Sequence, residues 1–285
     1  MAARPYQWTK NFLVFAAPAA ALVVGRPVTF GRTAGAALAF CVASSGTYLV
    51  NDAVDAEADR LHPTKAARPI ASGELSRRAG VLGGIVLFVL ALAGSLLLGG
   101  IVLGAVVAGY AVVSLAYSLA LKQVAALELL CISAGFVLRT VAGGVAARIP
   151  ISPWFLVVAC SGSLLIAAGK RTAELMSLGA RGAEHRVSLG WYRSSFLAVV
   201  RQLSAAVTVG AYLMWALTRT SRPDRLHQGP FGLLSVIPFA VAVLVVERAL
   251  ATGQGGAPEE LPLKNRALQL AGTAWLACLV LALLT

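Results

Sequence analysis

Long apolar segments recur along almost the whole chain, and they constrain the fold more than any other feature. Several approach the ~20 residues that a helix needs to cross the hydrocarbon core of a bilayer. Of the 285 residues, 58% are hydrophobic and only 13% are charged, a more apolar balance than soluble domains of this length have. The sequence therefore predicts an all-α, polytopic membrane protein whose helices satisfy their own backbone hydrogen bonds.

About nine segments qualify as candidate membrane spans. They cover roughly residues 11–25, 33–53, 79–98, 101–121, 124–146, 153–170, 194–218, 231–250 and 266–284. No tandem repeat divides the chain, so we expect a single transmembrane domain over residues 1–285.

The formal net charge of +12 is distributed unevenly over the predicted topology. If the N-terminus is cytoplasmic, alternating spans place most lysines and arginines on the cytoplasmic side. The outer side receives Arg26, Arg32, Arg148, Arg219, Arg222 and Arg225. This bias follows the positive-inside rule, and it predicts that the charged motifs described next face the cytoplasm.

One acidic motif stands where the second candidate span ends, with the sequence NDAVDAEADR. On an ideal helix Asp52, Asp55 and Asp59 fall within an arc of ~60°. Carboxylates so close together repel one another unless a cation holds them. Because Mg²⁺ needs few protein ligands when it also binds substrate phosphates, the motif predicts a site for a metal-bound diphosphate. A solvated acidic helix end is the structural alternative.

The loop that follows this motif is basic, and it reads HPTKAARPIASGELS. Lys65 and Arg68 could fold back onto phosphate oxygens that the metal leaves free. We therefore expect the aspartates to hold the metal and the basic residues to hold the anion.

A second charged motif ends the sixth candidate span, with the sequence GKRTAELMSL. Lys170 and Glu174 share a helix face at a spacing of four, and Arg171 stands beside them. A simple Lys–Glu helix pair would explain the spacing, but the motif is predicted to lie on the same side of the membrane as the aspartates. We expect the two motifs to converge.

Four further polar residues belong to the next candidate group. Tyr117 closes the fourth span, Lys122 lies in the turn and Glu128 enters the fifth span. Arg139 lies well inside that fifth span, where a cation is costly and usually functional. An interhelical partner for Arg139 is the structural alternative.

The pattern NDxxDxxxD, which begins at Asn51, followed by a basic loop and a second motif on about nine helices, resembles the UbiA superfamily of intramembrane prenyltransferases. The resemblance covers nearly the whole chain. It implies a helical bundle around a lipid tail, with Mg²⁺ bound through Asp52, Asp55 and Asp59. The second motif departs from the aspartate run of the aromatic-substrate members, since this chain has KRTAEL there.

Four other stretches are similar to a branch of that superfamily that acts on phosphoribose: RPYQWTKNFLVFAAP, GFVLRTVAGG, SPWFL and GKRTAEL. Members of that branch transfer phosphoribose from 5-phosphoribosyl diphosphate to a polyprenyl phosphate, decaprenyl phosphate, for cell-wall arabinan, and release diphosphate. Several phosphates must then be bound at once. The residues that could bind them are Arg4, Gln7, Lys10, Asn11, Lys122, Arg139, Lys170 and Arg171.

This resemblance implies an enzyme in the bacterial plasma membrane, with membrane lipid around it and no nucleic-acid partner. A homo-oligomer is compatible with it. The enzymatic alternative is a UbiA-type prenyltransferase that joins a prenyl diphosphate to an aromatic or other acceptor. From a different class, a transporter would place charges near the middle of several spans, whereas most charges here lie at the cytoplasmic ends.

Overall fold

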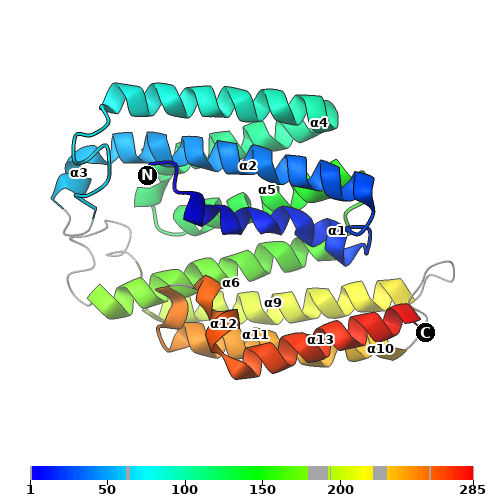
Figure 1. The fold of residues 1–285 in the computed structure, drawn as a ribbon. Coiled ribbons are helices and arrows are strands. Elements are labelled where there is room, and N and C mark those ends of the chain that lie inside the picture. The colour runs from blue at the N-terminus through cyan, green and yellow to red at the C-terminus, as the bar shows by residue number, and fades with distance from the viewer. Residues whose placement is uncertain are drawn as a thin grey trace. The chain divides into compact units, whose positions relative to one another are not determined.

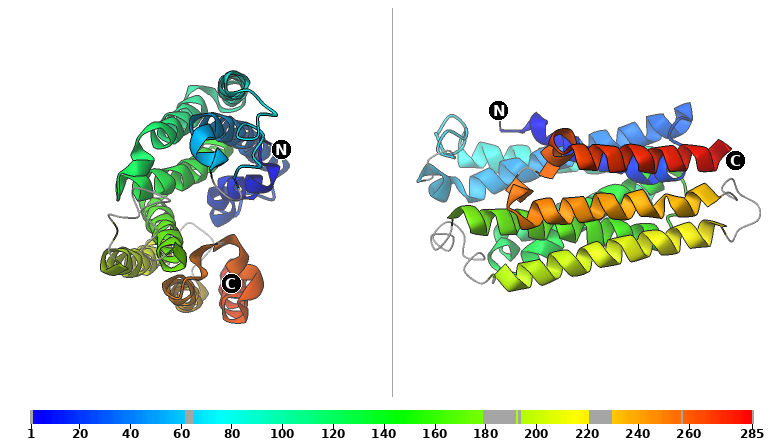
Figure 2. Two further views of the ribbon diagram at one scale, coloured as in Figure 1. Left: turned by 90° about the vertical axis from the view of Figure 1, so that its left-hand side faces the viewer. Right: turned by 90° about the horizontal axis from the view of Figure 1, so that it is seen from below.

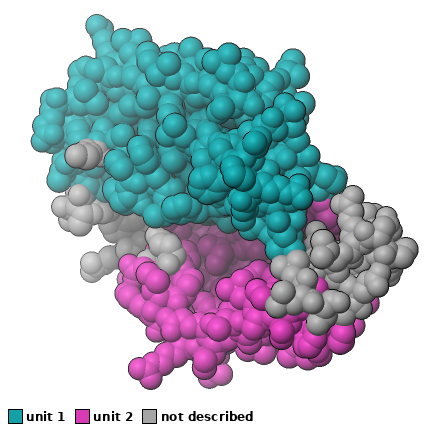
Figure 3. All heavy atoms as spheres, turned by 45° about the vertical axis from the view of Figure 1, so that its right-hand side comes forward, with its two compact units in different colours: residues 1–151 teal, residues 152–285 magenta. Residues whose placement is uncertain are grey.

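The computed structural model describes residues 2–61, 65–178, 192, 194–220, 230–256 and 258–284. All regular structure in these residues is helical (Figure 1). The chain divides into two compact units, Met1–Ile151 and Ser152–Thr285, which Figure 3 distinguishes by colour. Each unit is described by itself.

The described residues of unit 1 form two 3-10 helices and five α-helices. They are η1 (Pro5–Phe15), α1 (Ala16–Ala20), α2 (Pro27–Val54), α3 (Ala56–Arg60), α4 (Arg77–Leu119), η2 (Leu121–Gln123) and α5 (Leu127–Ala147). The element α2 packs against η1, α4 and α5. In Figures 1 and 2 the start of η1, the end of α2 and α3 lie at the same end of this unit.

The core of unit 1 brings side chains from η1, α2, α4 and α5 together around Val14, Phe40 and Leu103. A Cβ atom at Gly143 would lie 1.7 Å from the carbonyl oxygen of Val14, so only glycine lets η1 approach α5 this closely. Small residues permit such close packing in membrane bundles. This contact fixes the N-terminal segment against the bundle.

The long element α4 consists of two helical arms. Gly100 has φ 66° and ψ −163°, a combination that is essentially restricted to glycine. A Cβ at Gly104 would lie 2.5 Å from a methyl carbon of Leu96, so the second arm folds back beside the first. The arms correspond to the separately predicted spans 79–98 and 101–121.

Unit 2 contains the remaining helices. They are α6 (Pro153–Leu178), α9 (Ser194–Thr220), α10 (Pro230–Leu234), α11 (Val236–Ala251), η4 (Gln254–Gly256), η5 (Pro258–Glu260), α12 (Leu261–Lys264) and α13 (Arg266–Leu284). Its core contains Leu165, Val243 and Leu250. A Cβ at Gly255 would lie 2.3 Å from the carbonyl oxygen of Gly169, so η4 packs directly against α6.

The described residues form six helices that are long and apolar enough to cross a membrane: α2, α4, α5, α6, α9 and the stretch Pro230–Ala251. The all-α membrane fold is therefore confirmed, but the count of about nine spans is not. Two predicted spans share α4, and the last one, Arg266–Ala282, is a shorter apolar helix. The first predicted span is mostly η1, whose 11 residues extend about 22 Å because a 3-10 helix rises about 2 Å per residue.

Candidate active site

The acidic motif lies where α2 breaks. The backbone N–H of Asp55 donates to the carbonyl of Asn51 at 2.9 Å, and the Asn51 side-chain amide donates to Asp55 Oδ2 at 3.1 Å. After this C-cap, α3 begins at Ala56. The prediction of one continuous helix through the three aspartates is therefore wrong. Asp52 lies in α2, Asp55 lies at the break and Asp59 lies in α3.

Asp52 and Asp59 are buried, and one arginine joins them. Arg68 Nη1 lies 3.1 Å from Asp52 Oδ1 and 2.6 Å from Asp59 Oδ2, while Arg4 Nη2 lies 2.5 Å from the same oxygen of Asp52. The two aspartate side chains are only 2% and 5% exposed. Low exposure strengthens these ion pairs relative to surface pairs, and it makes each carboxylate depend on its arginines.

Asp55 pairs with a different basic residue. Lys122, from the turn between α4 and α5, forms an ion pair with Asp55 Oδ1, and the two side chains are 17% and 29% exposed. Lys122, predicted only as a phosphate-binding residue, thus lies beside the acidic motif. Each aspartate of the motif is held by at least one basic side chain from a different part of unit 1.

The N-terminal segment reaches this site through several contacts. The Arg4 guanidinium lies 5.1 Å from the ring centroid of Tyr48. Trp8 Nε1 donates to Ser45 Oγ at 3.1 Å, and that hydroxyl lies 3.1 Å from the carbonyl of Ala3. These contacts align η1 along α2 and deliver Arg4 to Asp52.

Arg139 is buried in the core of unit 1. Its Nε donates to Asn11 Oδ1 at 2.7 Å, its Nη1 to the carbonyl of Gly135 at 2.7 Å, and its Nη2 to Tyr110 Oη at 3.1 Å. The guanidinium also lies 5.9 Å from the ring centroid of Phe40. Arg139 and Asn11, both predicted as substrate-binding residues, therefore contact each other and join α5 to η1.

The other predicted residues of unit 1 occupy varied positions. Gln7, Lys10, Lys65 and Tyr117 are half-buried, and Glu128 is fully buried in the first turn of α5. Their assignment to a substrate remains a prediction.

In unit 2 the second motif forms the last turns of α6. Arg171 is 2% exposed and pairs with Glu174, whereas Lys170 is half-buried. The helix pair that forms is thus between Arg171 and Glu174, three residues apart. The predicted convergence of this motif with the aspartates concerns both units and stays a prediction.

A buried ion pair beside this motif was missed by sequence reasoning. Arg201 of α9 is 5% exposed, and its Nε lies 3.6 Å from Glu247 Oε1 of α11. Its Nη1 also donates to Thr172 Oγ1 at 2.7 Å, which links it to the turn that carries Arg171. Ionisable residues inside apolar spans are the signal that would have found them, as it found Arg139.

Hard oxygen ligands converge at the acidic motif in a way that suits a cation. Among the described residues no group of three or more acidic, histidine or cysteine side chains is arranged to hold a metal ion. Yet Asp52 and Asp59 both direct an oxygen at one cationic nitrogen of Arg68. Two carboxylates aimed at one position fit Mg²⁺, provided that the arginine moves.

The fold and this site define an intramembrane transferase family. The model of the UbiA prenyltransferase family matches residues 12–259, and the chain belongs to that family. A UbiA homolog from Archaeoglobus fulgidus, solved with DMAPP and Mg²⁺, has the same fold at a TM-score of 0.72 and 14% identity, with 98% of each chain covered.

Curated relatives indicate a narrower group within this family. The chain is 42% identical to decaprenyl-phosphate phosphoribosyltransferase of Mycolicibacterium smegmatis, over 96% of this chain and 89% of that protein. It is 40% identical to the protein of the same name from Corynebacterium glutamicum, over 99% of this chain and 85% of that protein. The sequence resemblance to the UbiA superfamily is thereby confirmed.

Proposed function

We propose that this protein transfers 5-phosphoribose from phosphoribosyl diphosphate to decaprenyl phosphate and releases diphosphate. The observation that carries the proposal is the site of unit 1, where three aspartates meet Arg4, Arg68 and Lys122. A donor with a diphosphate and a further phosphate needs both metal-binding carboxylates and cations. The relatives that are 40–42% identical support this choice of substrates.

Asp52, Asp55 and Asp59 would hold Mg²⁺ in this reaction. When bound, the ion would neutralise charge that grows on the diphosphate leaving group as the C1–O bond breaks. Arg68 already contacts two of these carboxylates, and its side chain is long enough to turn toward a phosphate oxygen instead.

The basic residues therefore exchange partners on binding. Without substrate, Arg4 and Arg68 neutralise Asp52 and Asp59, and Lys122 neutralises Asp55. With the metal and the donor in place, the same cations bind phosphate oxygens. Each exchange replaces one charge-assisted contact by another, so neither the carboxylates nor the cations are left buried without a counter-charge.

The acceptor needs little activation. A lipid phosphate is already ionised at neutral pH, so one of its oxygens can form the new bond to C1 of ribose while the diphosphate leaves with the old bonding electrons. Positioning and electrostatics would supply most of the rate enhancement. Arg139 and Asn11 hold η1, and thereby Arg4, in place for this step.

Unit 2 would contribute Lys170, Arg171 and Glu174 to the same reaction. The excess of basic residues on the predicted cytoplasmic side supports a site that faces the cytoplasm from the bacterial plasma membrane. Water-soluble phosphoribosyl diphosphate would reach the site from that side. We place Arg201 and Glu247 among the residues that fix this motif, because Arg201 contacts Thr172.

The test is product formation by the purified full-length chain in a bilayer. Radiolabelled phosphoribosyl diphosphate and decaprenyl phosphate should give a labelled lipid only when Mg²⁺ is present. If the protein instead joins a prenyl diphosphate to an aromatic acceptor and ignores phosphoribosyl diphosphate, the general prenyltransferase activity of the family is the right one. Transport of either substrate without product would contradict both enzymatic functions.

A further inference from the structure

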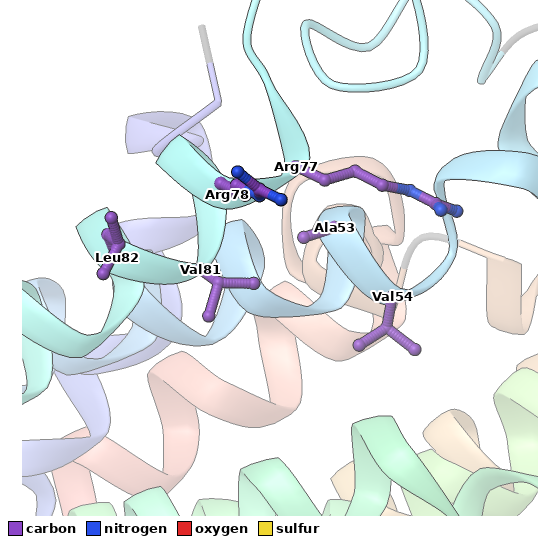
Figure 4. Close-up of a pocket in the computed structure, with 6 residues that line it drawn as sticks. All are labelled: Ala53, Val54, Arg77, Arg78, Val81 and Leu82. Carbon is purple, nitrogen blue, oxygen red and sulfur yellow. The ribbon is translucent and has the colours of Figure 1, made fainter.

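A groove of about 630 Å³ lies on unit 1 between the last turn of α2 and the first turns of α4. It is lined by Ala53, Val54, Arg77, Arg78, Val81 and Leu82, all labelled in Figure 4. Four lining residues are apolar and two are arginines. The groove therefore combines an apolar lining with two cationic side chains.

The apolar lining belongs to a surface that faces outward. Val54 is 41% exposed and Leu82 is 63% exposed, and the exposed residues Ile85 and Val89 continue the same stripe along α4. In a membrane protein such a stripe contacts acyl chains rather than water. The groove is thus a recess in the lipid-facing surface at the end of a membrane helix.

The two arginines are placed against the local helix electrostatics. Arg77 and Arg78 are the first two residues of α4, where the helix dipole disfavours cations. The end itself is already capped, because Ser76 Oγ accepts a hydrogen bond from the Ala79 N–H at 3.1 Å. The helix itself gains nothing from arginines there, and an external anion would offset their unfavourable position as well as their charge.

The arginines are also available to such an anion. Arg77 extends toward α3 and pairs with Glu57 at 3.0 Å, but these side chains are 44% and 78% exposed, and exposed pairs are weak. Within the described parts of the chain, the exposed Arg78 guanidinium has no ion pair. Both guanidinium groups can reach a phosphate at the level of the lipid headgroups.

We propose that this groove binds one anionic membrane phospholipid. Its headgroup phosphate lies between Arg77 and Arg78, and an acyl chain lies along Val54, Val81 and Leu82. The site is separate from the aspartates, because Ala53 faces Gly80 of α4, whereas Asp52 faces Arg4 and Arg68. The inference does not depend on the proposed reaction.

The experiment is a lipid titration of the purified full-length protein in detergent, followed by native mass spectrometry. Phosphatidylglycerol and phosphatidylcholine of equal chain length are compared. We expect the first phosphatidylglycerol to bind roughly tenfold more tightly than phosphatidylcholine. Phosphatidylglycerol is an anion, whereas the choline group of phosphatidylcholine neutralises the charge of its phosphate. The double variant Arg77→Gln/Arg78→Gln should lose this difference, and Arg78→Gln alone should lose most of it.

The matched control is Arg266→Gln. Arg266 is an exposed arginine at the first residue of α13, and it does not line the groove. It should keep the wild-type preference. Leu82→Ser should weaken binding of a long-chain phosphatidylglycerol but not of a short-chain one. All these residues are exposed, so the variants should melt like the wild type.

Three results would overturn the proposal. The first is an unchanged preference in the double variant. The second is an equal loss in Arg266→Gln, which would mean a diffuse charge effect. The third is displacement of phosphatidylglycerol by decaprenyl phosphate at lower concentration, which would make the groove a docking site for that lipid instead.

Discussion

Arg4 donates a hydrogen bond to Asp52 across 48 residues of sequence, so the first residues of the chain complete the acidic motif. Neither residue could remain buried as an ion without the other or a substitute. The site is thus a balanced set of charges before any substrate arrives, and changes in single members should have separable effects on binding and on stability.

Asp55→Asn should remove activity while leaving the fold intact. Asp55 is the most exposed of the three aspartates and contacts Lys122 and Asn51, so its loss disturbs little of the core. We expect transfer of phosphoribose to fall by at least about a hundredfold, since a metal ligand is lost. Product assays and a melting curve check this, and near-normal activity at any Mg²⁺ concentration would refute the metal role.

Asp52→Asn should damage both activity and stability. Asp52 is 2% exposed and accepts hydrogen bonds from Arg4 and Arg68. In the variant, both arginines lose the negative charge of this carboxylate. Breaking a buried ion pair costs about 3–5 kcal/mol. A melting temperature that is clearly lower than that of Asp55→Asn is expected, and equal melting temperatures would contradict this difference between the two sites.

Lys122→Met should change metal and donor binding in opposite directions. Without the ammonium group, Asp55 is free for a cation, and we expect Mn²⁺ alone to bind roughly tenfold more tightly. The KM for phosphoribosyl diphosphate should rise, because a phosphate contact is lost. Electron paramagnetic resonance of bound Mn²⁺ measures the first effect and steady-state kinetics the second.

The control for this variant is Lys264→Met. Lys264 pairs with Glu260 at the surface of unit 2, and removing its charge should alter neither quantity. Weaker Mn²⁺ binding in Lys122→Met would show that the lysine does not compete for the carboxylate.

Lys170→Ala should raise the KM for phosphoribosyl diphosphate by roughly tenfold, more than the KM for decaprenyl phosphate. Lys170 is half-buried and suits this test better than Arg171, whose buried pair with Glu174 supports α6. An equal rise for both substrates would place the lysine outside the donor site. Wild-type protein should give no product from prenyl diphosphate and an aromatic acceptor.

Gly100→Ala should destabilise unit 1 by about 1–3 kcal/mol, because its backbone conformation excludes a Cβ atom. The control is Gly94→Ala in the first arm of α4, where a Cβ would have nothing within 4 Å. That variant should be neutral or stabilising by up to about 1 kcal/mol. Thermal unfolding in detergent measures both, and similar effects of the two variants would contradict the role of the turn.

The sequence singled out charged residues that the structure brings together, but not how they pair. Asp52, Asp55, Asp59 and the basic loop were singled out from residue type and spacing, and the predicted spans 79–98 and 101–121 meet where the chain does reverse, at Gly100. The break at Asp55 was missed because helical periodicity continues through it. The pairing of Lys122 with Asp55 depends on how distant helices pack, which spacing cannot reveal. Arg201 was overlooked although it lies inside an apolar span like Arg139, because the contacts that mark it, with Thr172 and Glu247, come from other helices.

The hydrogen bond between Asn11 and Arg139 imposes an order on biosynthesis. The two residues are 128 positions apart, so the N-terminal helix leaves the ribosome long before its buried partner in α5 exists. Until α5 enters the bilayer, η1 lacks its contact with Arg139 and is held only by its contacts with α2, such as that of Trp8 with Ser45. Lys122 follows Asp55 by 67 positions, so the charge-balanced site is complete only after the turn between α4 and α5 has been made, and Arg139 then fixes η1 beside it.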